Sequence, residues 1–364
     1  MPSTWLSPSA HWKRRRPNCQ ACATSTWRPR RPGTTSATRC PDSRATAERQ
    51  ERLEKKGRPV ETTSTSDKTA GLIGLGAMGA GIAATLRRAG YQMHVCDARP
   101  GAAQAFAQEG GTAHGSPAEV AAQCERIVSV VVNAQQTEEV LFGPDGAAAA
   151  MKPGSVFVMC STVDPNWSIG LEKRLGELGI HYVDAPISGG AAKAASGQMT
   201  VMSSAKPEAY AKAGAMLDAM AGKVYRLGDR AGAGSKVKII NQLLAGVHIA
   251  AAAEAMALGL REGVAPDALY EVITHSAGNS WMFENRMAHV LAGDYTPLSA
   301  VDIFVKDLGL VLDTARATKF PLPLASTAHQ MFMQASTAGF AKEDDSAVIK
   351  IFPGIEIPKA KDKA

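Results

Sequence analysis

A glycine-rich turn between an apolar strand and a helix constrains the fold of this chain more than any other feature of its sequence. The turn is Gly74-Leu75-Gly76-Ala77-Met78-Gly79; it ends the apolar stretch 70–74 and opens a helical segment, 80–89, that stops before Gly90. Glycines here permit a tight turn and bring the backbone close to a pyrophosphate, which the free N–H groups of a helix N-terminus can bind. In this context the motif predicts a dinucleotide-binding unit, with these six residues as cofactor contacts.

Asp97 stands 18 residues after Gly79, at the end of the next predicted strand. A carboxylate at that position can accept hydrogen bonds from both hydroxyls of the adenosine ribose and repel a 2′-phosphate, which favours NAD as the cofactor. Arg99, two residues further on, is a residue type that could bind that phosphate, so NADP stays an alternative. A role for Asp97 as a turn or capping residue also stays open.

The chain from residue 67 onward alternates short β-branched runs with alanine-rich helical segments, which is typical of a parallel sheet with helices on both faces. We expect strands near residues 70–74, 92–97, 126–132, 155–160, 181–184, 198–203 and 223–227. Beyond Gly234 a long helix, 235–262, leads into further helices. The expected fold class is α/β: a Rossmann-type, doubly wound sheet in residues 67–233, followed by an all-helical substrate and oligomerisation domain in residues 234–364.

Residues 1–66 differ in composition from the rest of the chain. Residues 1–60 contain 14 Lys and Arg against 4 Asp and Glu, so the remainder has a net charge of −4 although the whole chain has +6. The remainder therefore gives no compositional case for a nucleic-acid groove. We expect residues 1–66 to be a disordered basic extension outside the fold; a transit peptide, or nucleic-acid binding through this segment alone, stays an alternative.

The number of cysteines and the hydropathy of the sequence indicate in which cellular compartment the protein works. Six cysteines in 364 residues are not a disulfide framework, and we expect a cytoplasmic protein. Cys19 and Cys22 form a CxxC pair, but no second pair follows at the spacing of a zinc site, so no metal is expected. No uninterrupted apolar run approaches the ~18 residues of a membrane-spanning helix.

Three polar segments follow predicted strands, where a doubly wound sheet holds its ligands. They are Ser161-Thr162, Asp184-Ala185-Pro186-Ile187-Ser188-Gly189-Gly190, and the stretch from Gly232 to Gln242 that enters the long helix. On that helix Lys238, Asn241 and Gln242 are spaced i, i+3 and i+4 and share one face. Each segment alone could be structural, since serines cap helices, glycines form turns and lysines usually face solvent.

Together these motifs resemble the β-hydroxyacid dehydrogenase family, which includes 3-hydroxyisobutyrate dehydrogenase, over nearly all of residues 69–353. The resemblance implies an NAD-dependent dehydrogenase acting on the CH–OH group of a small hydroxy acid. It implies that Lys238 is the catalytic residue, with Asn241 beside it. It also implies that Ser188, Gly189 and Gly190 bind the substrate carboxylate.

The same resemblance implies that Val132, Asn133, Thr162 and Lys306 lie around the nicotinamide end of the cofactor. For Lys306 an ion pair with Asp302, one helical turn earlier, is the structural alternative. Two positions depart from the family pattern: Gln242 replaces a second asparagine, and Val132-Asn133 replaces a Leu-Pro pair. We expect Gln242 to contact the substrate.

The segments 239–248, 278–286 and 344–350 resemble one branch of this family, which oxidises a four-carbon acid sugar with NAD. Asn241, Gln242 and Asn279 would serve its extra hydroxyls, whereas His248 and His275 are expected to be structural. Oxidation of 3-hydroxyisobutyrate, reduction of tartronate semialdehyde, and a catalytically silent NAD-binding module are the alternatives. The resemblance also implies a homodimer or homotetramer without nucleic-acid or membrane partners.

Overall fold

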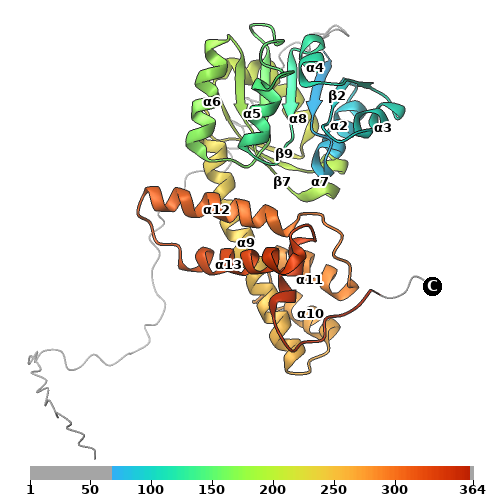
Figure 1. Ribbon diagram of the computed structural model, residues 1–364, viewed down its shortest axis with the longest axis vertical. Coiled ribbons are helices and arrows are strands. Elements are labelled where there is room, and N and C mark those ends of the chain that lie inside the picture. The colour runs from blue at the N-terminus through green and yellow to red at the C-terminus, as the bar shows by residue number, and fades with distance from the viewer. Residues whose placement is uncertain (1–67, 361–364) are drawn as a thin grey trace, which may run out of the picture. The chain divides into compact units, whose positions relative to one another are not determined.

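The computed structural model describes residues 68–360, in which strands occupy the first part and helices the second (Figure 1). The predicted fold class, a Rossmann-type sheet followed by helices, is confirmed. The predicted basic extension and the Cys19/Cys22 pair lie outside the described residues.

The strands of residues 68–360 form a nine-stranded sheet in the order β3-β2-β1-β4-β5-β6-β8-β7, with β9 paired to β8. Their bounds are β1 Thr69–Ile73, β2 Gln92–Cys96, β3 Thr112–Ala113, β4 Arg126–Ser129, β5 Val156–Met159, β6 His181–Asp184, β7 Ile187–Ser188, β8 Thr200–Ala205 and β9 Lys223–Arg226. All seven predicted strands are present, with ends that shift by up to three residues. β3 and β7 were missed because two residues are too short for a strand pattern to show.

The order of the strands determines where a ligand can bind. Strands β1 to β6 run parallel, and β8 turns antiparallel to β6. The chain leaves β1 toward β2 on one side and later returns to β4 on the other. The carboxyl ends of β1 and β4 therefore flank the switch point, where doubly wound sheets bind their ligands.

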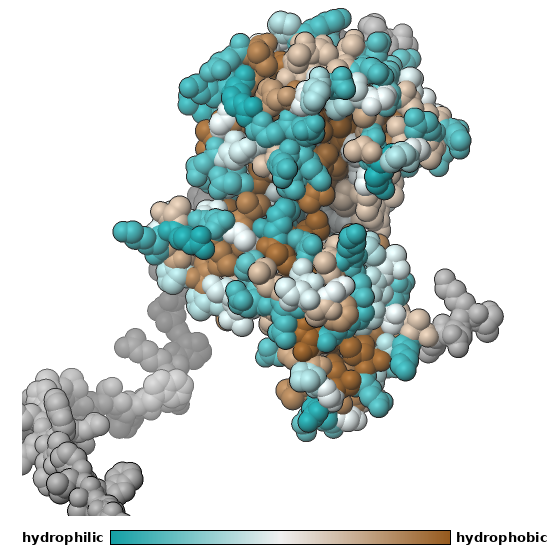
Figure 2. Space-filling model, viewed as in Figure 1, coloured by the Kyte–Doolittle hydropathy of each residue, from teal (hydrophilic) through white to brown (hydrophobic). Residues whose placement is uncertain are grey.

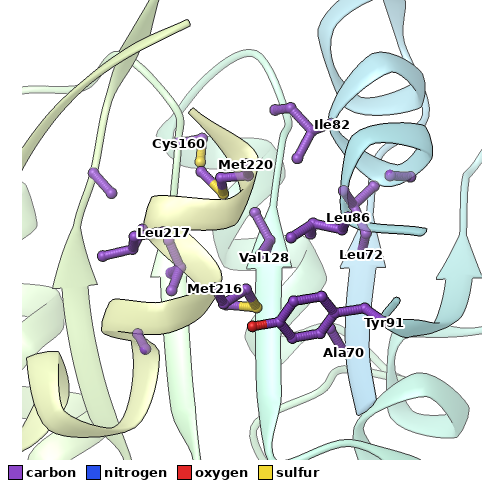
Figure 3. Close-up of a cluster of buried hydrophobic side chains, with 14 of the residues drawn as sticks. Ala70, Leu72, Ile82, Leu86, Tyr91, Val128, Cys160, Met216, Leu217 and Met220 are labelled. Atoms are coloured by element: carbon purple, nitrogen blue, oxygen red, sulfur yellow. The ribbon is translucent and has the colours of Figure 1, made fainter. Parts of the chain in front are cut away.

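Helices cover the sheet on both faces, each face with its own apolar core. One face packs α2 (Ala77–Arg88), α3 (Ala102–Gln108) and α8 (Pro207–Met220); the other packs α4 (Pro117–Gln123), α5 (Ala134–Phe142) and α6 (Pro165–Glu177). Figure 3 shows the first core, in which Leu72 of β1 and Val128 of β4 lie between α2 and α8. The short α7 (Gly190–Ser196) packs on α2.

The second part of the chain is built around α9 (Ala233–Arg261), at the predicted place of the long helix. The elements that follow are α10 (Pro266–Thr274), α11 (Trp281–Ala292), α12 (Val301–Ala317), α13 (Pro323–Ala335), the π-helix η2 (Ser336–Phe340) and the 3₁₀ helix η3 (Asp345–Ile351). Small residues let these helices approach α9 closely: a Cβ at Gly246 would lie 2.9 Å from Leu308 of α12. The apolar core of this part is separate from the two cores of the sheet.

By length and composition alone, α9 could cross a membrane, although polar residues interrupt its apolar sequence. Half of its most apolar window is buried among the other helices, and Lys238 and Gln242 are buried on it as well. These features are those of the core helix of a globular protein.

A buried carboxylate at the end of β6 holds the N-terminus of α9. Asp184 Oδ2 accepts hydrogen bonds from the backbone N–H groups of Gly232 and Ser235, both at 2.9 Å, and Oδ1 accepts one from Ser235 Oγ at 2.6 Å. Ser204 Oγ of β8 donates to Oδ2 and accepts from Gly234 N. The first N–H groups of a helix have no partner within the helix, so this carboxylate both satisfies them and fixes the direction of α9.

We expect the substitution Asp184→Asn to destabilise the protein by roughly 2 to 4 kcal/mol, because an amide nitrogen would face donors that a carboxylate oxygen now satisfies. Chemical denaturation followed by circular dichroism measures the loss. Asp218→Asn removes the same charge from an exposed site on α8 and is the control. Equal stability of the two variants would contradict the anchoring role of Asp184.

Candidate active site

The glycine-rich turn after β1 has the geometry that a pyrophosphate needs. Gly74 has a positive φ of 98°, and a Cβ at Gly79 would lie 1.8 Å from the Gly74 carbonyl oxygen. Gly76, the N-cap of α2, faces open space: nothing lies within 4 Å of an added Cβ. Gly74 and Gly79 thus make the turn possible, and Gly76 leaves room for a ligand beside the free N–H groups of the first turn of α2.

Asp97 lies beside this turn and is held by it. Its Oδ2 accepts a hydrogen bond from Leu75 N at 2.5 Å, and its Oδ1 accepts from Arg99 N at 2.8 Å and Nε at 3.0 Å. Burial raises the pKa of Asp97, but the hydrogen bonds from Arg99 and Leu75 outweigh it, so this pKa lies below its usual value. The carboxylate is charged at neutral pH and also braces the glycine turn.

The loops after β4 and β5 form the next part of the site. Ser161 Oγ donates to the carbonyl of Val131 at 2.7 Å, which ties the two loops together. Val132 lies in an exposed position and donates its N–H to the Gln136 side chain. Asn133 caps α5 by accepting a hydrogen bond from Gln136 N at 2.8 Å.

These loops open into a cavity of about 460 Å³ that both parts of the chain line. Thirteen of the site residues predicted from the sequence line this cavity: Gly76, Ala77, Met78, Gly79, Val132, Thr162, Ser188, Gly189, Gly190, Lys238, Asn241, Gln242 and Lys306. Gly74, Leu75 and Asp97 lie next to it in the glycine turn, and Asn133 directs its side chain to the cap of α5. Most of the predicted residues therefore come together around one cavity.

Lys238 is buried in the wall of this cavity, on the second turn of α9. Its Nζ donates a hydrogen bond to Gln242 Oε1 at 2.8 Å. Burial lowers the pKa of Lys238 to about 8; the charge of Asp307 raises it, and that of Lys306 lowers it further. The lowered pKa makes the neutral form, which a general base requires, more accessible than in an ordinary lysine.

Gln242 connects Lys238 to α12. Its Nε2 donates to Asp307 Oδ2 at 2.6 Å, and its Oε1 also accepts from Asn241 Nδ2 at 3.1 Å. Lys306 Nζ donates to Asp307 Oδ1 at 2.5 Å and to the carbonyl of Thr162 at 3.1 Å. The alternative ion pair of Lys306 with Asp302 is wrong, since Asp302 accepts from Ser336 while Lys306 pairs with its neighbour Asp307.

The loop 188–190 is fixed to the glycine turn through α7. Gly189 and Gly190 have φ values of 134° and 75°, which favour glycine, and both residues line the cavity. Thr85 Oγ1 of α2 donates to the carbonyl of Ala194 in α7 at 3.0 Å, and a Cβ at Gly81 would lie 2.7 Å from Ala195 N. The two glycine loops thus keep a constant spacing.

Sequence reasoning missed the wall that α11 contributes. Trp281, Met282, Asn285 and Arg286 line the cavity, whereas Asn279, expected to serve substrate hydroxyls, is not in its lining. Asn279 donates instead to the carbonyl of Thr274 and to Glu284. Helical spacing from the exposed Trp281 could have suggested Asn285, which lies one turn further along the same face.

Two other kinds of group bear on the chemistry of residues 68–360: metal ligands and the two histidines considered in the sequence. No set of three or more His, Cys, Asp and Glu side chains among them could hold a metal ion. His248 and His275 are exposed and outside the lining of the cavity.

Comparison with known proteins agrees with this site. Residues 69–228 match the NAD binding domain of 6-phosphogluconate dehydrogenase, and residues 232–352 match the NAD-binding domain of NADP-dependent 3-hydroxyisobutyrate dehydrogenase. The chain belongs to the 3-hydroxyisobutyrate dehydrogenase-like family, whose members are NAD(P)-dependent dehydrogenases that act on hydroxy acids.

Individual relatives match nearly along their whole length. The chain is 68% identical to L-threonate dehydrogenase from Cupriavidus necator over 79% of this chain and 97% of the relative. It is 53% identical to L-threonate dehydrogenase from Escherichia coli K12 over 80% and 97%. The crystal structure of 3-hydroxyisobutyrate dehydrogenase from Salmonella typhimurium superimposes with a TM-score of 0.75 at 56% identity, over 78% of this chain and 99% of that one.

We expect Gly76→Val to leave folding intact but to weaken cofactor binding at least tenfold, because the added side chain would fill the space left for the pyrophosphate. Titration of NAD by calorimetry measures the affinity. Gly176→Val, at an exposed position of α6 where an added Cβ also meets nothing within 4 Å, is the control. Unchanged NAD affinity in Gly76→Val would contradict this placement of the cofactor.

Proposed function

We propose that the protein catalyses the NAD-dependent oxidation of L-threonate at C2 to 2-dehydro-L-erythronate, a step in the catabolism of four-carbon acid sugars. The observation that carries this proposal is the cavity in which buried Lys238 lies between the glycine turn of α2 and the loop 188–190. The identity of 52% to 68% with L-threonate dehydrogenases of several bacteria supports the choice of substrate.

Lys238 acts as the general base in the proposed mechanism. Residues 74–79 would hold the nicotinamide cofactor, which would accept the hydride from C2 of the substrate. The hydroxyl proton must leave as well, and the lone pair of neutral Lys238 accepts it. The hydrogen bond to Gln242 Oε1 holds one N–H of the amine, so that the lone pair can face the substrate. In the reverse reduction, protonated Lys238 returns the proton.

The loop of Ser188, Gly189 and Gly190 binds the substrate carboxylate in this proposal. No hydrogen bond to another described residue occupies the Ser188 hydroxyl, which lines the cavity. Asn241 orients the substrate hydroxyl or the amine of Lys238. Gln242 was predicted from the sequence to contact the substrate, but its amide oxygen and its amide nitrogen both hydrogen-bond to protein groups. We therefore assign Gln242 to positioning Lys238.

The cofactor contacts proposed are Gly74, Leu75, Gly76, Ala77, Met78, Gly79, Asp97, Val132, Asn133, Thr162 and Lys306. We propose NAD rather than NADP because the charged carboxylate of Asp97 repels a 2′-phosphate. Arg99 does not offset this repulsion: its guanidinium is already hydrogen-bonded to Asp97 and to the carbonyl of Leu75.

Several wider features belong to the same proposal. Residues 67–233 form the cofactor domain and residues 234–364 the substrate and oligomerisation domain.

A homodimer or homotetramer is supported by the exposed apolar side chains Ile240 and Leu244 on α9. A cytoplasmic location is supported by Cys96, Cys124 and Cys160, which are buried free thiols.

A second candidate is oxidation of 3-hydroxyisobutyrate, which the 56% identity to the 3-hydroxyisobutyrate dehydrogenase of Salmonella typhimurium favours. Kinetics with L-threonate, 3-hydroxyisobutyrate and D-glycerate, each with NAD and with NADP, separates the two. We expect L-threonate with NAD to give the highest kcat/KM, since a site that hydrogen-bonds substrate hydroxyls rejects analogues that lack them. A higher kcat/KM for 3-hydroxyisobutyrate would favour the second candidate.

We expect Lys238→Ala to lower kcat by roughly 10² to 10⁴, the usual contribution of a positioned base, with NAD binding preserved. Lys238→Arg should recover little, because a guanidinium does not release its proton in this pH range. Lys236→Ala removes an exposed lysine from the same helix and should keep wild-type activity. Wild-type kcat in Lys238→Ala would exclude Lys238 as the base.

The pH profile checks the same residue. The base must be deprotonated, so kcat/KM for oxidation should rise with pH and level off above the pKa of about 8. Reduction of the product should instead fall through the same range, since it requires protonated Lys238. The Lys238→Ala variant should lose this inflection, and its persistence would assign the titration to another group.

A further inference from the structure

The proposed function does not use one wall of the cavity, which α11 forms. Trp281, Met282, Asn285 and Arg286 lie on the same face of this helix and line the cavity. Trp281 lies under the ammonium group of Lys193, 5.6 Å from the ring centroid, and Lys193 belongs to α7, which begins in the loop 188–190. The α11 wall therefore faces the loop proposed to bind the carboxylate.

Arg286 is the obvious candidate to bind an anion on this wall, but its guanidinium is already occupied. It pairs with both carboxylate oxygens of Asp345 in η3, through Nε and through Nη2. Arg286 is buried, with 7% of its surface exposed, and Asp345 has none. With its charge neutralised and two donor groups engaged, Arg286 is a structural element of the wall.

The third guanidinium nitrogen of Arg286, Nη1, sets the orientation of Asn285. Nη1 of Arg286 donates to Asn285 Oδ1. The amide cannot be flipped, because Nδ2 would then meet the N–H of the guanidinium donor to donor. No described residue accepts a hydrogen bond from Nδ2 of Asn285, a residue that lines the cavity and is partly exposed. The structure thus presents a fixed pair of N–H donors to a bound substrate.

We propose that Asn285 donates a hydrogen bond to the C4 hydroxyl of the substrate and so determines specificity for a four-carbon hydroxy acid. The inference rests on the proposed function. With the carboxylate on the loop 188–190 and the C2 hydroxyl at Lys238, the far end of the substrate extends toward the α11 wall. There the C4 hydroxyl oxygen meets a donor that no protein group satisfies. 3-Hydroxyisobutyrate has no further hydroxyl to offer it.

The test compares L-threonate with its 4-deoxy analogue, 2,3-dihydroxybutanoate of the same configuration. Asn285→Leu keeps the branched shape of the side chain and removes the donors. We expect its kcat/KM for L-threonate to fall about tenfold or more while kcat/KM for the 4-deoxy analogue changes less than about threefold. The wild-type preference for the four-carbon sugar acid would thereby collapse, which a general loss of structure would not produce.

Two further variants keep the outcome interpretable. Asn285→Ala removes the N–H groups without adding bulk or charge, and it should lose the same preference even if Asn285→Leu is unstable. Met282→Leu alters the same wall without touching a donor and should retain the preference. If L-threonate stays preferred over the 4-deoxy analogue in both Asn285 variants, the inference is overturned while the proposed function stands. If the wild-type enzyme itself prefers 3-hydroxyisobutyrate, both fail.

Discussion

The carboxylate of Asp184 is the interaction on which the rest of this structure depends. It lies at the carboxyl end of β6, with none of its surface exposed, and receives hydrogen bonds from the start of α9 and from β8. A buried carboxylate is costly unless such donors surround it, and here they are the otherwise unsatisfied N–H groups of a helix N-terminus. Burial raises the pKa of Asp184, and the hydrogen bonds from Ser235 and Gly232 limit the rise. Because Lys238 lies one turn beyond Ser235, this anchor also sets the position of the proposed base.

Close approaches at glycine position the other side of the cavity. The glycine turn packs at Gly74 against the backbone of Val130, just after β4, and α7 packs on α2 at Gly81; a Cβ at either position would lie under 3 Å from backbone atoms. Interiors packed at this density do not adjust to an added methyl group without a shift of the backbone. The spacing between the proposed pyrophosphate and carboxylate loops is therefore a property of packing among α2, α7 and β4, and no flexible side chain can alter it.

Much of the fold and a large part of the candidate site could be predicted from the sequence, for local reasons. Strand patterns, the glycine turn and the i, i+3, i+4 spacing of Lys238, Asn241 and Gln242 all depend on neighbours in the chain. The partners of long side chains do not. Helical spacing suggests an ion pair of Lys306 with Asp302. Lys306 instead pairs with adjacent Asp307, because its ammonium group also donates to the carbonyl of Thr162, 144 residues away in the sequence. Asn279 was expected in the cavity, but it closes the turn before α11, and only the packing of α11 brings Asn285 there.

The cations of the cavity explain why hydrogen bonding, and not ion pairing, should select the substrate. The charged side chains in the lining are Lys238, Arg286, Lys306 and Asp307. Lys306 pairs with Asp307 and Arg286 with buried Asp345, while burial brings Lys238 toward its neutral form. The cations are thus paired or partly deprotonated, and the anionic end of a hydroxy acid is left to the backbone groups of the loop 188–190. Attraction between charges would favour any small carboxylate alike, but a donor of fixed direction favours the acid that carries a hydroxyl at the matching carbon. Discrimination among small hydroxy acids therefore falls to neutral groups such as Asn285, whose orientation the paired Arg286 maintains.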